Sequence, residues 1–300
     1  MKKTLIIGIV LILILVLAGC EQFFTTNVFG AFEDKSPPST KELSESFSGD
    51  NDLEAVTALK ERLSPSVVED MTEEEIQDII TVLEDETGIN EAYDAGDSDD
   101  PEAVETYQIA SITAANLTLS TGGDEIVDNV APALMDTMDS MGSEDFSAES
   151  SFEDIMDSLS GGEQVDPNTV ESLVSAGAYY NNYAATLDPD GDGVYSTSDE
   201  VNSGEVFQDS IVPLTVNMLF TNMDGDDEDK YAAIADVMDG DIPITETNPD
   251  TGETQISAEF TALFPQDSTV EEQLDITQME SFTTLAGAAG LALPESDTTN

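Results

Sequence analysis

Apolar residues recur every three or four positions through most of the chain beyond residue 50, which is the spacing of one helical face. Leu53, Val56, Leu59 and Leu63 form the first such face. A second helix is predicted between Thr72, where a glutamate three residues on completes a capping box, and Gly88. Two longer helices are predicted over about 101–120 and 167–187, because each begins with an Asp-Pro dipeptide. The pattern therefore predicts an all-α fold.

The two longer helices begin a predicted internal repeat. Asp100–Thr121 and Asp166–Leu187 align without gaps, and each is followed by a second helix and then by a third. The third helix begins 52 positions after Asp100 in the first copy and 65 positions after Asp166 in the second. The difference is the length of an aspartate-rich stretch, Asp188–Glu200, that the first copy lacks.

We therefore predict three-helix repeats over residues 100–165 and 166–241, stacked as an α-solenoid-like array of helical hairpins. The other interpretation is that helices with similar caps resemble one another. Near the C-terminus, Asn248-Pro249-Asp250 is a turn signal between two short runs, which predicts a β-hairpin near 242–257. A last helix is predicted over about 269–291.

The first twenty residues form a separate segment. Lys2 and Lys3 precede an apolar stretch, Leu5 to Leu17, that is shorter than the ~20 residues of a membrane-spanning helix. The stretch ends in Leu17-Ala18-Gly19-Cys20. This segment resembles a bacterial lipoprotein signal peptide with its lipobox. An uncleaved N-terminal membrane anchor is the alternative interpretation.

The resemblance implies that the chain is cut before Cys20 and that Cys20 receives a diacylglyceryl group and an amide-linked chain such as palmitate. Two acyl chains suffice for stable anchoring, whereas one gives only marginal binding. The implied location is the cell envelope, with the body extracytoplasmic, periplasmic or at the cell surface. The expected organisation is a signal peptide over 1–19, a lipidated N-terminus and flexible tether over 20–50, and a helical domain over 51–300. Cys20 is the only cysteine, so no internal disulfide can form.

Charge narrows the choice of partners. The chain has 65 acidic and 7 basic residues and no histidine, giving a net charge of −58. Nucleic-acid binding is excluded because it needs many basic side chains to neutralise phosphates. A hydrophobic content of 39% at helical spacing argues against disorder. The composition also resembles that of proteins from salt-loving organisms, where screening relieves self-repulsion.

One stretch carries the residues of a calcium site. Counted from Asp188, carboxylates fall at positions 1, 3, 5 and 12, and Gly193 at position 6 allows a sharp turn. This spacing resembles the calcium loop of EF-hand and dockerin modules. The resemblance implies six ligands, with Val194 acting through its backbone carbonyl: Asp188, Asp190, Asp192, Val194, Ser196 and Asp199. An exposed acidic turn is the alternative interpretation.

Catalytic signals are weak. The chain lacks histidine, a free thiol after acylation and a phosphate-binding glycine loop, and close carboxylate pairs are inevitable among 65 acids. The sequence therefore favours a lipid-anchored envelope protein that binds or scaffolds another envelope protein or a transporter component, with a structural calcium site. A carboxylate-dependent hydrolase acting on wall or sugar polymers is the alternative.

Overall fold

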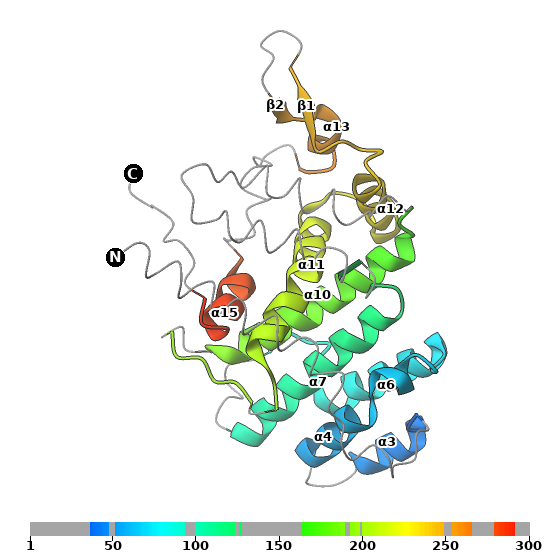
Figure 1. Ribbon diagram of the computed structural model, residues 1–300, viewed down its shortest axis with the longest axis vertical. Coiled ribbons are helices and arrows are strands. Elements are labelled where there is room, and N and C mark those ends of the chain that lie inside the picture. Colours follow the sequence, from blue (N-terminus) through cyan, green and yellow to red (C-terminus); the bar gives the residue numbers. More distant parts are fainter. Residues whose placement is uncertain are drawn as a thin grey trace.

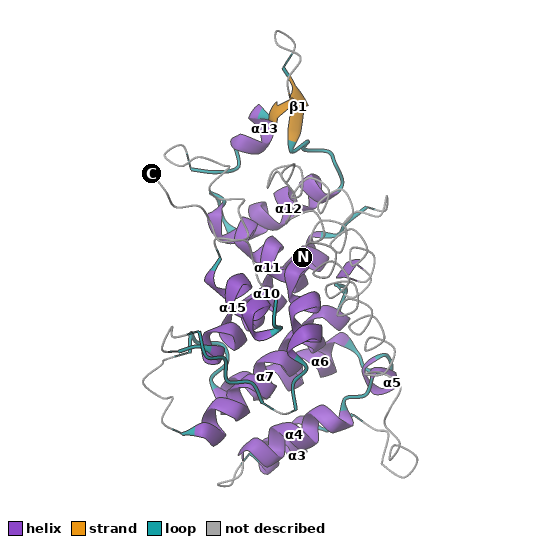
Figure 2. Cartoon of the chain, turned by 60° about the vertical axis from the view of Figure 1, so that its left-hand side comes forward, coloured by secondary structure: helices purple, strands orange, loops and turns teal. Residues whose placement is uncertain are grey.

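The computed structural model describes residues 37–47, 52–93, 100–123, 126–127, 164–189, 193–198, 200–248, 254–265 and 279–291. Within these ranges the chain forms ten helices and one two-stranded sheet, so the predicted all-α fold is confirmed (Figures 1 and 2). The helices are α3 (Thr40–Ser46), α4 (Asp52–Arg62), α5 (Pro65–Val68), α6 (Glu73–Thr87), α7 (Pro101–Ser120), α10 (Pro167–Leu187), α11 (Ser203–Asn222), α12 (Asp227–Met238), α13 (Ala258–Thr261) and α15 (Glu280–Ala288).

The predicted helix caps are present. The Thr72 side chain accepts from the Glu75 backbone N–H, and the Glu75 carboxylate accepts from the Thr72 N–H at 2.8 Å. At the starts of α7 and α10, Asp100 and Asp166 each accept a backbone N–H two residues on, ahead of a proline in the first turn. These local bonds satisfy backbone donors that a helix leaves unpaired at its start, which is why the sequence placed the starts correctly.

The helices are stacked in layers around α7 and α10, which lie side by side at the centre (Figure 1). Helices α4 and α6 pack on α7, whereas α11, α12 and α15 pack on α10. Thirteen of the 20 residues of α7 are buried, on all sides of the helix. This explains why α7 has no clear polar face, since helices cover it on opposite sides.

The predicted β-hairpin is also confirmed. Strands β1 (Thr245–Thr247) and β2 (Thr254–Ile256) pair antiparallel, with Thr245 opposite Ile256. The hairpin and α13 extend from one end of the helical stack (Figure 1).

The tether prediction is wrong for residues 40–47. Ser39 and Glu42 form a second capping box at the start of α3, and Leu43 and Phe47 are buried at 4% and 5% exposure. The run Pro37-Pro38-Ser39-Thr40 has the composition of a linker, although Ser39 and Glu42 have the spacing of a capping box. The body therefore begins about ten residues earlier than expected.

The internal repeat stays a prediction. Helices α10, α11 and α12 match the predicted second copy, and α7 matches the first helix of the first copy. The rest of the first copy, beyond 126–127, lies outside the described residues. Helix α15 lies within the predicted last helix, whose first part also falls outside the described ranges.

Candidate functional site

The candidate calcium loop connects α10 to α11. Asp188 caps the C-terminal end of α10, and Val194 and Ser196 lie further along the loop. The structure thus brings three of the predicted ligands into one turn of the chain. The other three, Asp190, Asp192 and Asp199, lie outside the described residues.

The loop turns back on the end of α10. The Gly193 backbone N–H donates to Oδ2 of Asp188 at 2.9 Å, and the Ser196 N–H donates to the carbonyl of Leu187 at 2.8 Å. Gly193 has a φ of 76°, a left-handed conformation that glycine adopts without strain. Position 6 of the motif is therefore a sharp turn, and the carboxylate of position 1 lies at its start.

A glutamine from α7 fixes the second half of the loop. The Gln108 side chain is 2% exposed; its Nε2 donates to the Ser196 carbonyl at 2.8 Å, and its Oε1 accepts the Ser198 N–H at 2.9 Å. Both ends of one buried amide are thus paired with loop backbone. The sequence gives no signal for this role, because Gln108 lies 88 positions before Ser196 in the chain.

The end of the loop is held by charged side chains. The Ser198 hydroxyl donates to Oε1 of Glu105 at 2.7 Å and accepts the Glu200 N–H at 3.1 Å. The Lys60 ammonium, from α4, donates to the Glu200 carbonyl. The loop is therefore attached to α7 and α4 as well as to α10 and α11.

Burial perturbs the two charged groups beside this end of the loop. Desolvation lowers the pKa of Lys60, and the carboxylates of Glu200 and Glu205 oppose that shift. Desolvation raises the pKa of Glu205, and Lys60 opposes it. Each group therefore makes the partial burial of the other less unfavourable.

Two of the predicted ligands lie at the surface of the loop: Val194 is 67% exposed, and Ser196 is exposed as well. Among the described residues, no group of three or more His, Cys, Asp or Glu side chains is placed to hold a metal ion. Since three predicted carboxylate ligands lie outside that part, the calcium site stays a prediction.

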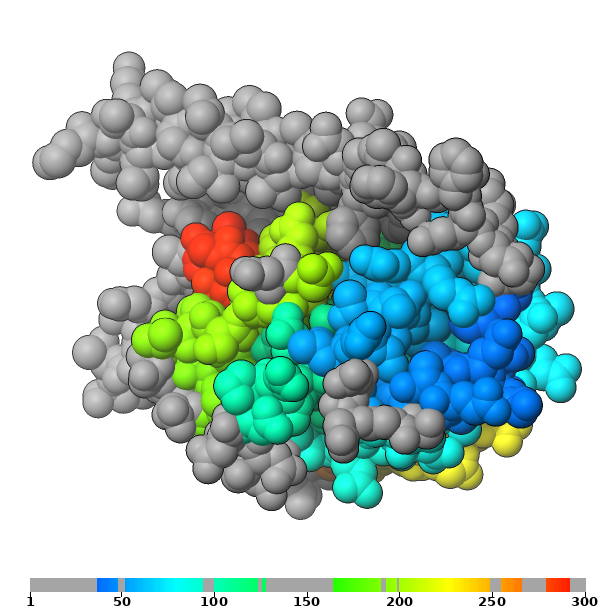
Figure 3. All heavy atoms as spheres, turned by 90° about the horizontal axis from the view of Figure 1, so that it is seen from below, coloured from blue at the N-terminus to red at the C-terminus, as the bar shows by residue number. Residues whose placement is uncertain are grey.

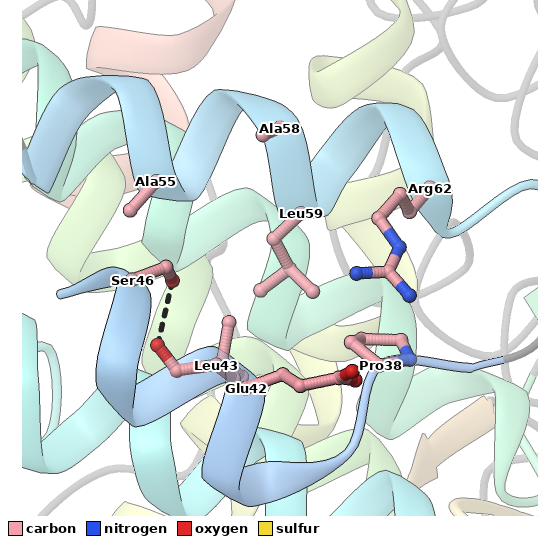
Figure 4. Close-up of a pocket in the computed structure, with 8 residues that line it drawn as sticks. All are labelled: Pro38, Glu42, Leu43, Ser46, Ala55, Ala58, Leu59 and Arg62. Atoms are coloured by element: carbon pink, nitrogen blue, oxygen red, sulfur yellow. Dashed lines mark hydrogen bonds between the residues drawn. The ribbon is translucent and has the colours of Figure 1, made fainter.

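A small crevice lies between α3 and α4 (Figure 4). It has a volume of about 90 Å³, and its charged residues are Glu42 and Arg62. The Glu42 carboxylate accepts the Ser39 N–H at 3.2 Å and the Ser39 hydroxyl at 3.1 Å, and these bonds lower its pKa. The crevice offers one carboxylate, already used as a cap, whereas glycoside hydrolysis needs two.

Comparison with known protein families, curated proteins and solved structures finds no match to this chain. No described helix combines the length and the apolar character needed to cross a membrane. The predicted lipidation residue, Cys20, lies outside the described residues.

Proposed function

We propose that this protein is a lipid-anchored component of the cell envelope whose helical body binds or holds another envelope protein, such as a transporter component. The observation that carries the proposal is the lipobox-like run Leu17 to Cys20 after a short apolar stretch. The body contributes a large helical surface with a strongly acidic composition. Anionic headgroups would repel such a body, so the acyl chains provide the membrane attachment.

The proposal includes a calcium ion with a structural role in the loop from Asp188 to Asp199. The left-handed turn at Gly193 and its bond to Asp188 support it, because they curve the chain at the position that the motif requires. The anchoring of the loop by Gln108 supports a structural rather than a mobile site. A bound divalent cation would also reduce repulsion among the local carboxylates.

The anchor is tested by mass spectrometry of the protein extracted from membranes. We expect a mature chain that begins at an acylated Cys20, and we expect Cys20→Ala to release the body from the membrane. A mature chain that still begins at Met1, or a Cys20→Ala variant that remains in the membrane fraction, would contradict the anchor.

The calcium site is tested by thermal unfolding at a fixed, high ionic strength. A ligand that binds only the folded state stabilises it by about 2.7 kcal/mol at one hundred times its dissociation constant. For a chain of this size we expect a rise in Tm on the order of 5 °C. Asp190→Ala and Asp192→Ala should each abolish the rise.

Asp224→Ala is the matched control, because Asp224 lies in a different acidic turn, before α12. This variant should keep the calcium response. The calcium site is refuted if sodium chloride at equal ionic strength reproduces the shift, or if Asp190→Ala and Asp192→Ala both retain it.

The binding role is tested by affinity purification of the acylated protein from its own envelope after mild cross-linking. We expect one envelope protein in a constant ratio to the bait, and we expect Cys20→Ala to lose it. Recovery of no protein above the background of the untagged strain would contradict the role.

A further inference from the structure

Helix α15 depends on its surroundings for its helical form. It has nine residues, and its N-cap residue, Met279, makes no side-chain capping bond. It also contains Gly287 in its last turn. Isolated helices shorter than ~12–15 residues are marginal in water, so docking must stabilise α15.

One side of α15 packs on the central helices. Phe282, Leu285 and Ala286 are buried, and the Phe282 ring lies 5.4 Å from the Phe207 ring of α11. The Ser281 hydroxyl donates to Oδ1 of Asn181 in α10 at 2.5 Å. These contacts hold α15 against α10 and α11.

Another side of α15 is contacted by the candidate calcium loop. A Cβ atom placed on Gly287 would overlap the hydroxyl end of the Tyr195 ring and would lie 2.8 Å from its Cε2 atom. Only a residue without a side chain allows the ring to lie so close. In the space-filling view of Figure 3, the yellow-green chain around the loop lies beside the red atoms of α15.

The position of Tyr195 is set from both sides. Two residues earlier, Gly193 is bonded to the Asp188 carboxylate. On the other side, Ser196 is bonded through its carbonyl to Gln108 and through its N–H to Leu187. A change at the Asp188 end of the loop therefore acts on the short backbone segment that carries the ring.

We infer that Gly193–Ser198 is a clamp that couples the conformation of the loop to the docking of α15, so that a divalent cation in the loop and a docked α15 stabilise each other. The coupling is reciprocal, because a ligand that favours the docked state is itself bound more tightly by that state. The cation half of the inference rests on the proposed calcium site. The clamp itself rests on the contact between Tyr195 and Gly287.

Hydrogen exchange of the mature, full-length protein tests the clamp, with and without calcium at constant ionic strength. Without calcium, Tyr195→Ala should speed exchange of the α15 amides by about fivefold and leave α6 unchanged. Tyr195→Phe should behave like the unmodified protein, because it keeps the ring. Equal α15 exchange in Tyr195→Ala and the unmodified protein would overturn the clamp.

Calcium should slow α15 exchange by a similar factor in the unmodified protein and have no effect on α15 in Tyr195→Ala. Gly287→Ala distinguishes the coupling from helix propensity. Alanine favours the helix, but its methyl group would displace the Tyr195 ring. The effect of calcium on α15 exchange should therefore disappear in this variant. Retention of that effect in either variant would refute the coupling.

Calorimetry with calcium alone distinguishes the two proposals. Calcium binding without any change in α15 exchange would refute the coupling and leave the calcium site standing. If the unmodified protein binds no calcium, the calcium site and the cation half of the inference are both refuted. The clamp is then tested by comparing α15 hydrogen exchange in Tyr195→Ala and the unmodified protein without calcium.

Discussion

Gly177 marks the closest approach of two central helices, and Gly177→Ala should separate them. A Cβ atom at this position in α10 would overlap the carbonyl oxygen of Pro213 in α11 and would lie 2.6 Å from Cβ of Asn217. The Pro213 carbonyl belongs to a helix backbone, so it cannot rotate away as a flexible side chain would. The two helices must therefore move apart or bend.

The cost of that movement can be worked from its parts. Overpacking a well-packed contact destabilises by about 1–3 kcal/mol. The crossing also carries two amide bonds, from Asn217 Nδ2 to the Val174 carbonyl and from Asn181 Nδ2 to Asn217 Oδ1, each contributing about 1 kcal/mol. Alanine returns about 1 kcal/mol through its better helix propensity. We expect a net loss of about 3 kcal/mol, or a fall in Tm of roughly 6–12 °C in a chain of this size.

Urea unfolding followed by circular dichroism measures this loss, with Gly204→Ala as the matched control. A Cβ atom on Gly204, in the first turn of α11, would meet only Oδ1 of Asn202 at 3.6 Å. That variant should be as stable as the unmodified protein or slightly more stable. If Gly177→Ala unfolds at the same urea concentration as Gly204→Ala, the close crossing of α10 and α11 is wrong.

Three further predictions concern buried side chains. Gln108→Ala removes both bonds to the loop and should lower the free energy of unfolding by about 2–3 kcal/mol in urea titrations; an unchanged midpoint would argue against the anchor. Burial raises the pKa of Tyr107 and Tyr183 to about 12 and that of Tyr179 beyond the usual tyrosine range, so the unfolded chain ionises first and stability should fall as pH rises above about 10. With no tryptophan in the chain, tyrosinate absorbance reports this directly, and ionisation of all seven tyrosines near pH 10 in a folded protein would contradict it. Leu43→Ala should weaken the docking of α3 by about 2–3 kcal/mol, seen as faster hydrogen exchange over residues 40–47; unchanged exchange there would mean that Leu43 does not hold α3.

Features specified by neighbouring residues could be predicted from the sequence. The capping box at Thr72 and the cap at Asp100 involve residues two or three positions apart, so the residue pattern alone gave the helix starts. The turn at Gly193 followed from the same kind of local spacing. The box at Ser39 is equally local, but prolines and serines surround it, and such a composition is typical of a linker.

The support of the loop could not be predicted in this way. Gln108 and Ser196 are 88 positions apart, and Lys60 and Glu200 are 140 apart. Nothing in the local pattern distinguishes a buried glutamine that bonds a distant loop from one that bonds its own helix. Likewise, the sequence shows only that Gly287 is a small residue in a predicted helix. Its contact with the Tyr195 ring depends on the fold and could not be predicted.

The burial of α7 on opposite sides has a consequence for the order in which the chain completes its fold. Helices α4 and α6 precede α7 in the chain and can cover one side of it as soon as all three have been synthesised. The other side waits for α10, which also ties back to the early helices through the bond from Tyr179 to Glu84. Among the described helices, α10 is the one that packs most extensively on this side, so before residue 187 has emerged α7 lacks that cover and its apolar surface favours aggregation. Truncated chains that end after α7 should therefore be insoluble. Chains that extend through α10 should be more soluble, because α4, α6 and α10 can all pack on α7.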